Sequence, residues 1–358
     1  MELELRCLNN QLVGWRYAKV TEFPVRRALE ILMIRRRDFI ATVGIMLASP
    51  QRPTHAYETN KIPTIAYLGP STPAVDSYRL PAFKERLRGL GWIEGSTIVI
   101  EYRWAAGSEE HLAEIATEFA SEKFNVIVTA STPTALALKQ ATTVIPLVFA
   151  AVGDPIGTGL VPSLTHPGGN VTGLWLRESY AAGKRLEILR EIVPGLRHVA
   201  IIANSRNAAT AFDMREARAT ARTLGIEVVT AEIHHPEDIS RAFGVFKNQV
   251  QALYVCNDPL AITYRTRISI LAMGARLPTV FTGREYVEAG GLISYAPNFA
   301  DAYSRAADLV DKVLRGARPA DIPVEQLTKF GLVLNLTTAK ALGLTIPESF
   351  VLRADEIL

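Results

Sequence analysis

From residue 62 onward, short apolar runs alternate with segments in which apolar residues recur every three or four positions. Continuous apolar runs are typical of buried strands, whereas the longer spacing is typical of amphipathic helices. The run 62–69 predicts a strand, and Leu80, Phe83 and Leu87 share one face of a helix expected over 77–90. Further strands are expected at 97–102, 126–130 and 146–150, with helices at 111–124 and 132–141. This alternation predicts a parallel sheet with helices on both faces.

A second series with the same alternation follows Asn170. Its expected helices are 182–193, 209–224, 236–248, 263–273 and 299–314, and its expected strands are 198–203, 227–231, 252–256, 278–282 and 291–295. A tail follows, with a strand at 330–336 and a short helix at 338–342. Two similar α/β lobes are therefore expected.

Upstream of both series, three arginines followed by an apolar segment predict an export signal. The apolar segment 39–49 has eleven residues, fewer than the ~20 that a membrane-spanning helix needs. Ala56 offers a small residue at the cleavage point, and RRDFI (36–40) fits the twin-arginine pattern. We expect a signal peptide at 33–56, a periplasmic protein, and a mis-assigned extension at 1–32. The alternative is a short basic helix packed on the domain.

Charge and cysteine content narrow the class of protein. The chain has 358 residues, 48% of them hydrophobic, and a net charge of +3. Much of the positive excess lies in the expected presequence, so the rest gives no electrostatic argument for binding nucleic acid. Cys7 lies upstream, so Cys256 is the one cysteine left after processing and no internal disulfide is expected. Cys256 lies in an apolar strand, where a buried, inert thiol is expected.

Motifs for catalysis are absent from the sequence. It contains no phosphate-binding GxxxxGK[ST] loop and no GxSxG nucleophile motif. The pair His234-His235 precedes Pro236, which indicates a solvated turn or helix start, and no second pair has metal-ligand spacing. We therefore expect no enzyme, no metal and no cofactor.

Small polar residues follow several of the expected strands. Ligands of open α/β sheets bind beyond the carboxyl ends of the strands, so these residues predict a small polar cleft. A helix start at Ser131 suits a carboxylate, although Ser131 or Thr132 could instead only cap its own helix. Asp154 could pair with an ammonium or cap the next turn. The candidate ligand-binding residues are Ser71, Thr72, Ser131, Thr132, Pro133, Asp154, Asn204, Asn257, Asp258 and Arg284.

Longer motifs carry a resemblance to a known family. They are GLGWIEGSTIVIEYRWAAG (89–107), ASTPTALALKQATTVIPLVF (130–149), GDPIGTGLVPSLTHPGGNVTGL (153–174), REYVEAGGLISY (284–295) and TKFGLVLNLTTAKALGLTIPES (328–349). The chain resembles the substrate-binding proteins of ABC transporters, in the subfamily related to tryptophan- and tyrosine-binding receptors.

The resemblance implies a type I periplasmic-binding fold, with two Rossmann-like lobes joined by three crossings. The N-terminal lobe is expected at 62–173 and 296–319, and the C-terminal lobe at 174–295 and 320–358. The resemblance further implies an exported protein that captures an amino acid or similar small carboxylate by hinge closure. Ser131-Thr132-Pro133 would meet the ligand's carboxylate and Asp154 its ammonium. The implied partners are this ligand and an ABC permease of the inner membrane, with the protein itself a monomer.

Two other classes of protein remain open. A ligand-sensing domain of a signalling system could use the same two-lobe fold. Regulators of the lactose-repressor type place a helix-turn-helix ahead of the lobes, for which residues 1–60 are too short and too interrupted by proline. An α/β enzyme is disfavoured by the missing motifs.

Overall fold

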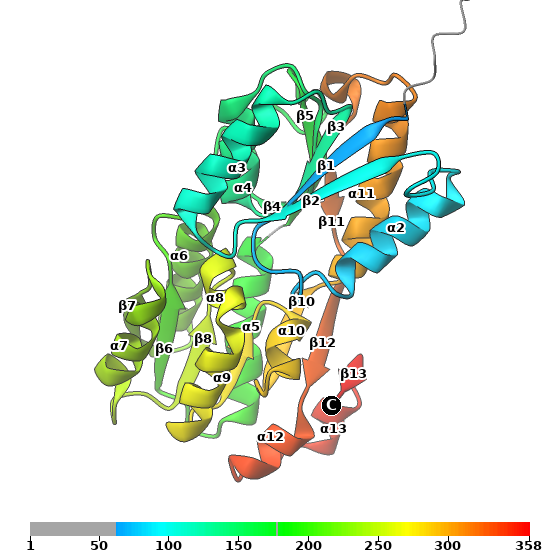
Figure 1. Cartoon of the computed structure of the whole chain (residues 1–358). Helices are drawn as coiled ribbons and strands as arrows, with labels where there is room; N and C mark the ends of the chain where they lie inside the picture. The colour runs from blue at the N-terminus through cyan, green and yellow to red at the C-terminus, as the bar shows by residue number, and fades with distance from the viewer. Residues whose placement is uncertain (1–61, 177) are drawn as a thin grey trace, which may run out of the picture. The chain divides into compact units, whose positions relative to one another are not determined.

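The computed structural model of the chain describes residues 62–176 and 178–358 (Figure 1). Residues 61–358 form one compact unit. The expected extension at 1–32 and the expected signal peptide at 33–56 lie outside the described residues. Within the described ranges, no helix has both the length and the apolar composition to cross a membrane.

The first lobe is built on a six-stranded sheet with the order β11-β5-β4-β3-β1-β2. Every neighbouring pair in it is parallel. The central strands are buried throughout, as expected for a parallel sheet covered on both faces. The strands are β1 (Thr64–Gly69), β2 (Val99–Trp104), β3 (Val126–Thr129), β4 (Leu147–Gly153), β5 (Val171–Leu176) and β11 (Glu325–Leu327).

Two helices cover each face of this sheet (Figure 1). On one face, α2 (Arg79–Gly89) and α11 (Phe299–Leu314) pack on alternate residues of β1 such as Ile65 and Tyr67. On the other face, α3 (Glu109–Ser121) and α4 (Thr132–Ala141) pack on Ala66 and Leu68. Successive strand residues point to opposite faces, so β1 contributes to both cores.

The second lobe is built on a seven-stranded sheet with the order β13-β12-β10-β9-β8-β6-β7. β10 and β12 pair antiparallel, and the other neighbours pair parallel. Its strands are β6 (His198–Ala203), β7 (Glu227–Glu232), β8 (Ala252–Val255), β9 (Thr279–Phe281), β10 (Ile293–Pro297), β12 (Phe330–Leu334) and β13 (Glu356–Ile357). Its helices are α5 (Glu178–Ile192), α6 (Ala208–Thr223), α7 (Pro236–Phe246), α8 (Pro259–Thr263), α9 (Arg265–Gly274), α10 (Arg284–Glu288), α12 (Leu336–Ala341) and α13 (Glu348–Val351).

The chain passes between the sheets three times: after β5, between β10 and α11, and between β11 and β12. The expected α/β fold with two Rossmann-like lobes and three crossings is confirmed. The predicted lobe boundaries need correction, because β5 continues to Leu176 and β11 pairs with it in the first sheet. Residues 174–176 and 325–327 therefore belong to the N-terminal lobe. Glu325–Leu327 is too short and too polar to be recognised as a strand without its partner β5.

Several individual elements agree with the sequence-based expectations. α4 and α11 have the expected bounds. The helix expected at 263–273 instead begins earlier, as the short α8 followed by α9, because Asp258 caps the backbone N–H of Leu260. His235 is the N-cap of α7, in agreement with the expected helix start. Cys256 is fully buried, as expected.

The core of the second lobe contains a buried ion pair. Arg185 of α5 lies 3.4 Å from Asp213 of α6, measured from Nη1 to Oδ1, and each side chain is only 1% exposed. Tyr254 of β8 donates a hydrogen bond of 2.7 Å to the same Asp213 oxygen, and Arg185 Nε donates to the Tyr295 carbonyl at 2.8 Å. Burial raises the pKa of Asp213, and the Arg185 charge opposes this rise. The pair thus holds two helices and two strands together.

We expect Arg185→Met to lower the free energy of unfolding by about 3–5 kcal/mol, because it leaves the Asp213 carboxylate buried without its cation. The double variant Arg185→Met/Asp213→Leu should recover most of this loss, since no buried charge remains. Urea unfolding of both variants and the wild type measures the difference. A single variant as stable as the wild type would contradict the role of the ion pair.

Candidate functional site

A cavity lies where the strand-end loops of the two sheets meet. It has two chambers that share Pro70, Asn207, Asp258 and Pro259 in their walls. We call them the larger chamber, of about 280 Å³, and the smaller chamber, of about 50 Å³. Each chamber is lined by both lobes.

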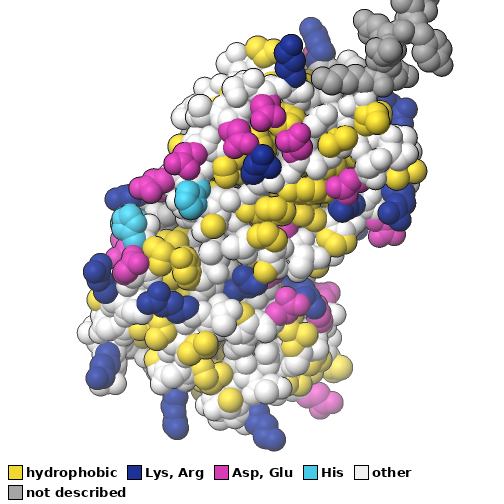
Figure 2. All heavy atoms as spheres, viewed as in Figure 1, with side chains coloured by type: hydrophobic (Ala, Val, Ile, Leu, Met, Phe, Trp, Pro, Cys, Tyr) yellow, Lys and Arg dark blue, Asp and Glu magenta, His cyan; other side chains and the backbone are white. Residues whose placement is uncertain are grey.

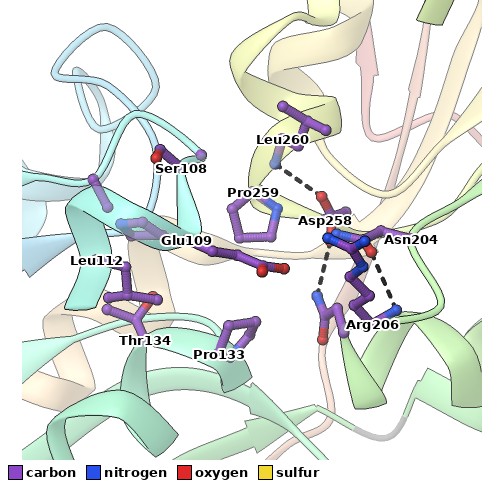
Figure 3. Close-up of a pocket in the computed structure, with 14 residues that line it drawn as sticks. Ser108, Glu109, Leu112, Pro133, Thr134, Asn204, Arg206, Asp258, Pro259 and Leu260 are labelled. Carbon is purple, nitrogen blue, oxygen red and sulfur yellow. Dashed lines mark hydrogen bonds between the residues drawn. The ribbon is translucent and has the colours of Figure 1, made fainter. Parts of the chain in front are cut away.

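Loops at the carboxyl ends of parallel strands supply the walls of the larger chamber (Figure 3). The first lobe contributes residues after β1 and β2 and from the first turns of α3 and α4. The second lobe contributes residues after β6 and β8. Parallel strands end at one edge of their sheet, so both lobes present their loops to the same space. The lining residues are Pro70, Ala105, Gly107, Ser108, Glu109, Leu112, Pro133, Thr134, Asn204, Arg206, Asn207, Asp258, Pro259 and Leu260.

Asp258 is the buried carboxylate of this cavity, with an exposed fraction of 2%. Its Oδ2 accepts a hydrogen bond from Asn207 Nδ2 at 3.0 Å, and its Oδ1 accepts from the Leu260 N–H at 2.9 Å. Burial raises the pKa of Asp258 to about 6, and the bonds from Asn207 and from the first turn of α8 limit the rise. The carboxylate is therefore charged at neutral pH and held in one orientation.

The first turn of α4 faces the smaller chamber through Ser131 and Thr132. Ser131 has a φ of 69°, a left-handed conformation that is uncommon outside glycine. Within the described chain, its side chain makes no capping bond to the helix backbone, because its Oγ pairs with Thr134 Oγ1 at 2.7 Å. Thr132 Oγ1 instead accepts from the Gly153 N–H at 3.0 Å. The expected alternative, that Ser131 only caps its own helix, is therefore not what the structure shows.

Charged side chains of opposite sign face the larger chamber from the two lobes. Glu109 extends from α3 across the cavity toward the loops of the second lobe (Figure 3), where Arg206 follows β6. On the face shown in Figure 2, Asp and Glu side chains gather over the lobe that contains α3, and Lys and Arg side chains are frequent on the other lobe. The opposite charges favour approach of the two lobes.

The lobes also touch directly beside the cavity. Ser71 Oγ lies 2.8 Å from Thr263 Oγ1 of the other lobe. Arg79 of α2 forms an ion pair with Glu285 of α10. Gly107 approaches α8 so closely that a Cβ there would lie 3.0 Å from both Leu260 Cα and the Pro259 carbonyl oxygen.

The structure brings six of the ten sequence-predicted residues into the cavity walls. Ser131, Thr132 and Asn257 line the smaller chamber, Pro133 and Asn204 line the larger one, and Asp258 lines both. Ser71 lies at the lobe contact described above.

The other three predicted residues do not line either chamber. The Asp154 Oδ1 accepts from the Gly157 N–H at 2.9 Å and so closes a turn after β4. Arg284 is bound by Glu356 and Glu288. Thr72 accepts from the Val75 N–H through its carbonyl oxygen at 3.0 Å. A role of these three in binding stays a prediction.

Sequence reasoning missed the wall residues that lie at the starts of the helices after the strand-end loops. Glu109 and Leu112 belong to the first turns of α3, and Asn207 caps α6 by accepting the Ala209 N–H at 3.1 Å. An N-cap pattern before an expected helix was the available signal. Arg79 gave no signal, because its ion-pair partner Glu285 lies 206 residues away in the chain.

The cavity offers groups that can bind a small polar molecule. It offers carboxylate, guanidinium, amide and helix-start groups around a small space, with apolar walls from proline and leucine. In the part of the chain that the structure describes, no three His, Cys, Asp or Glu side chains are grouped so as to hold a metal ion.

Two Rossmann-like lobes, three crossings and a polar cleft between the strand ends define the type I periplasmic-binding fold. The chain belongs to the ABC transporter substrate binding protein family, whose model matches residues 71–358. This family assignment confirms the resemblance that the sequence motifs indicated.

Individual relatives agree with this assignment. The chain is 28% identical to a tyrosine-binding protein of Clostridioides difficile over 272 residues, which covers 76% of this chain and 78% of the relative. A conserved domain protein of Vibrio cholerae is 30% identical, with a TM-score of 0.78 over 83% of this chain and all of its own. An ABC domain of Streptococcus pneumoniae in complex with L-Trp is 26% identical, with a TM-score of 0.75 over 82% of this chain and all of its own.

We expect Gly107→Ala to hold the lobes apart, because the added Cβ meets the backbone of α8. Gly107 has a φ of 75°, and Gly95→Ala is a matched control, since Gly95 has a φ of 78° and open space around it. Both changes place an alanine in a left-handed backbone conformation, which costs about 1–2 kcal/mol. Small-angle scattering should show a larger radius of gyration for Gly107→Ala alone. Equal radii for the two variants would contradict a close contact between the lobes at this position.

Proposed function

We propose that this protein captures a small zwitterion, an amino acid or a similar small carboxylate, between its lobes and delivers it to an ABC permease of the inner membrane. The observation that carries the proposal is the cavity that both lobes line with groups of opposite charge. In it, the helix start of α4 suits a carboxylate and Asp258 suits an ammonium. The tyrosine- and tryptophan-binding relatives support an amino acid as the ligand.

Asp258 is a better partner for an ammonium than Asp154. Both carboxylates accept a backbone N–H nearby in the chain, but Asp258 lines both chambers, whereas Asp154 lines neither. A charge-assisted hydrogen bond in a buried site is stronger than one in water, which favours recognition at Asp258.

The size and walls of the cavity limit the ligand. Its larger chamber lies near the low end of the ~300–1,000 Å³ range of small-molecule sites. Leu112, Pro133 and Leu260 give it an apolar surface, on which the non-polar part of a ligand can pack. This favours a single amino acid over a peptide or an oligosaccharide.

Hinge closure is the proposed mechanism of capture. Three crossings join the lobes, and rotation about a few residues in such connections opens and closes a cleft. The ligand binds to groups of both lobes and so stabilises the closed arrangement over the open one.

The rival hypothesis of a ligand-sensing domain has less support. The family match concerns the substrate-binding proteins of ABC transporters and covers most of the chain. We propose that the protein works as a periplasmic monomer, without nucleic acid as a partner.

We expect Asp258→Asn to weaken binding of the tightest-bound amino acid by about 10–100-fold, the loss of one hydrogen bond to a charged group. Wild-type affinity should also fall as the pH drops below about 6, because Asp258 then becomes protonated. Calorimetric titration against the standard L-amino acids measures both effects. Asp154→Ala is the control and should bind as the wild type does. If Asp154→Ala weakens binding and Asp258→Asn does not, the ammonium of the ligand binds Asp154 and the proposed role of Asp258 is wrong.

The same carboxylate should affect the stability of the ligand-free protein. The folded state raises the pKa of Asp258, so it binds the proton more tightly than the unfolded state does. The free energy of unfolding of the wild type should therefore decrease as the pH rises from about 4 to about 7, by up to about 3 kcal/mol. Asp258→Asn lacks this fall while its amide oxygen can still cap α8. Denaturant unfolding across this pH range measures the difference, and parallel curves for the two proteins would contradict the prediction.

We expect a chain begun at Met33 to be exported and shortened to a start near Tyr57, since 33–56 has the pattern of a signal peptide. Cell fractionation and N-terminal sequencing in a Gram-negative host measure this. Replacement of Arg36 and Arg37 by lysine separates the twin-arginine route from general secretion. Retention of an intact N-terminus in the cytoplasm would contradict the proposed location.

A further inference from the structure

Arg79 is a buried cation in the wall of the smaller chamber, with an exposed fraction of 5%. Its guanidinium lies 4.4 Å from the centre of the Phe299 ring. It forms an ion pair with Glu285 of the other lobe, and its Nη1 lies 4.0 Å from Asp76 Oδ1. These contacts fix the position of the guanidinium, because its stacking and its ion pair come from different elements.

The hydrogen-bonding capacity of this guanidinium is not used up by the protein. Arg79 Nε is buried and has no hydrogen-bond partner among residues 62–176 and 178–358. A buried donor without a partner destabilises the folded protein, so an unpartnered Nε at a cavity wall points to a group that binds there. Asp76 Oδ1 and Glu285 Oε2 also lack partners there. These two oxygens bring negative charge near Arg79, but they accept and cannot donate.

Two helix starts face the same chamber. Ser131 and Thr132 belong to the start of α4, and Asn207 and Ala209 to the start of α6. The first N–H groups of a helix have no partner within the helix and carry a partial positive charge. Arg79 therefore lies beside two further sources of positive potential, one from each lobe.

We propose that the smaller chamber is the subsite for the carboxylate of the ligand and that Arg79 is the side chain that binds it. This inference rests on the proposed function. A chamber of about 50 Å³ has room for a polar group larger than a single water, such as a carboxylate. Asp258 lies in the wall that the two chambers share, so an ammonium on the neighbouring carbon reaches it. The rest of the ligand then extends into the larger chamber. A carboxylate, an ammonium on the neighbouring carbon and a side chain in this arrangement make up a free α-amino acid.

Arg79 also connects the ligand to the contact between the lobes. Its Nη2 donates to Glu285 of α10, while its buried Nε has no partner among the described residues. One planar guanidinium can bind two carboxylates with different N–H groups. The bound ligand and Glu285 thus both contact the Arg79 side chain. The carboxylate of the ligand then adds to the contact that Arg79 and Glu285 make between the lobes.

The test compares an amino acid with its carboxamide, which keeps the ammonium and the side chain but has no carboxylate. The probe is whichever standard L-amino acid binds the wild type most tightly by calorimetry. We expect the wild type to prefer the acid to the amide by at least about 50-fold, and Arg79→Gln to reduce this ratio to about threefold or less. The cost of lobe closure is common to both ligands, so the ratio reports on the carboxylate alone.

Three further variants keep the result interpretable. Asp258→Asn should weaken acid and amide equally and leave their ratio unchanged, since both carry the ammonium. Arg86→Gln removes an arginine of the same helix α2 that lines neither chamber and pairs with Asp308, and it should leave the ratio as it is. If Arg79→Gln does not fold because Glu285 is left unpaired, Arg79→Gln/Glu285→Gln removes both charges and should show the same loss of preference.

The outcomes separate this inference from the proposed function. If no amino acid binds the wild type, the proposed function fails, and the inference fails with it. If an amino acid binds but the wild type does not distinguish it from its amide, the inference alone is wrong. It is also wrong if the ratio persists in the Arg79 variants, and the chamber then holds water.

Discussion

The whole cleft depends on the parallel pairing of strands in the two sheets. Each parallel strand is followed by a crossover helix, so successive strands end at the same edge and their loops gather there. β1, β2 and β3 bring Pro70, Gly107 and Ser131 to one edge, and β6 and β8 bring Asn204 and Asp258 to the other. Three crossings keep these edges facing each other. The hydrophobic cores on both faces of each sheet then make the loops a fixed frame, while the space between the lobes remains free for a ligand.

The buried charges of the molecule fall into two groups with different physical consequences. Arg185 and Asp213 are neutralised within the core of the second lobe, where Tyr254 and a backbone carbonyl add hydrogen bonds. Between the lobes, burial raises the pKa of Asp258, and the Nε of Arg79 has no partner among the described residues. Incomplete compensation of this kind lowers the stability of the empty protein. It also leaves binding capacity for a molecule that carries both charges, which is the trade between stability and function seen at many binding sites.

Strained backbone occurs in the same loops. Ala106, Ser131 and Asp154, which follow β2, β3 and β4, have positive φ angles that side chains other than glycine rarely adopt. At Ser131 this conformation directs the first turn of α4 to the smaller chamber, and at Gly107 the backbone can approach α8. At Asp154 it belongs to a turn outside both chambers.

The order of apolar runs and helical segments was enough to predict the two-lobe α/β fold, because core burial imposes its periods of 2 and 3.6 locally. It was also enough to place polar residues such as Ser131 and Asp258 at strand ends. Local patterns could not assign β11 to the first sheet, since a short polar strand is recognised only by its partner β5. Nor could they distinguish Asp258 from Asp154, or reveal Arg79, whose partner Glu285 is 206 residues away in the chain. Burial, charge and cavity shape at these positions arise from packing between the lobes, and only the tertiary structure decides them.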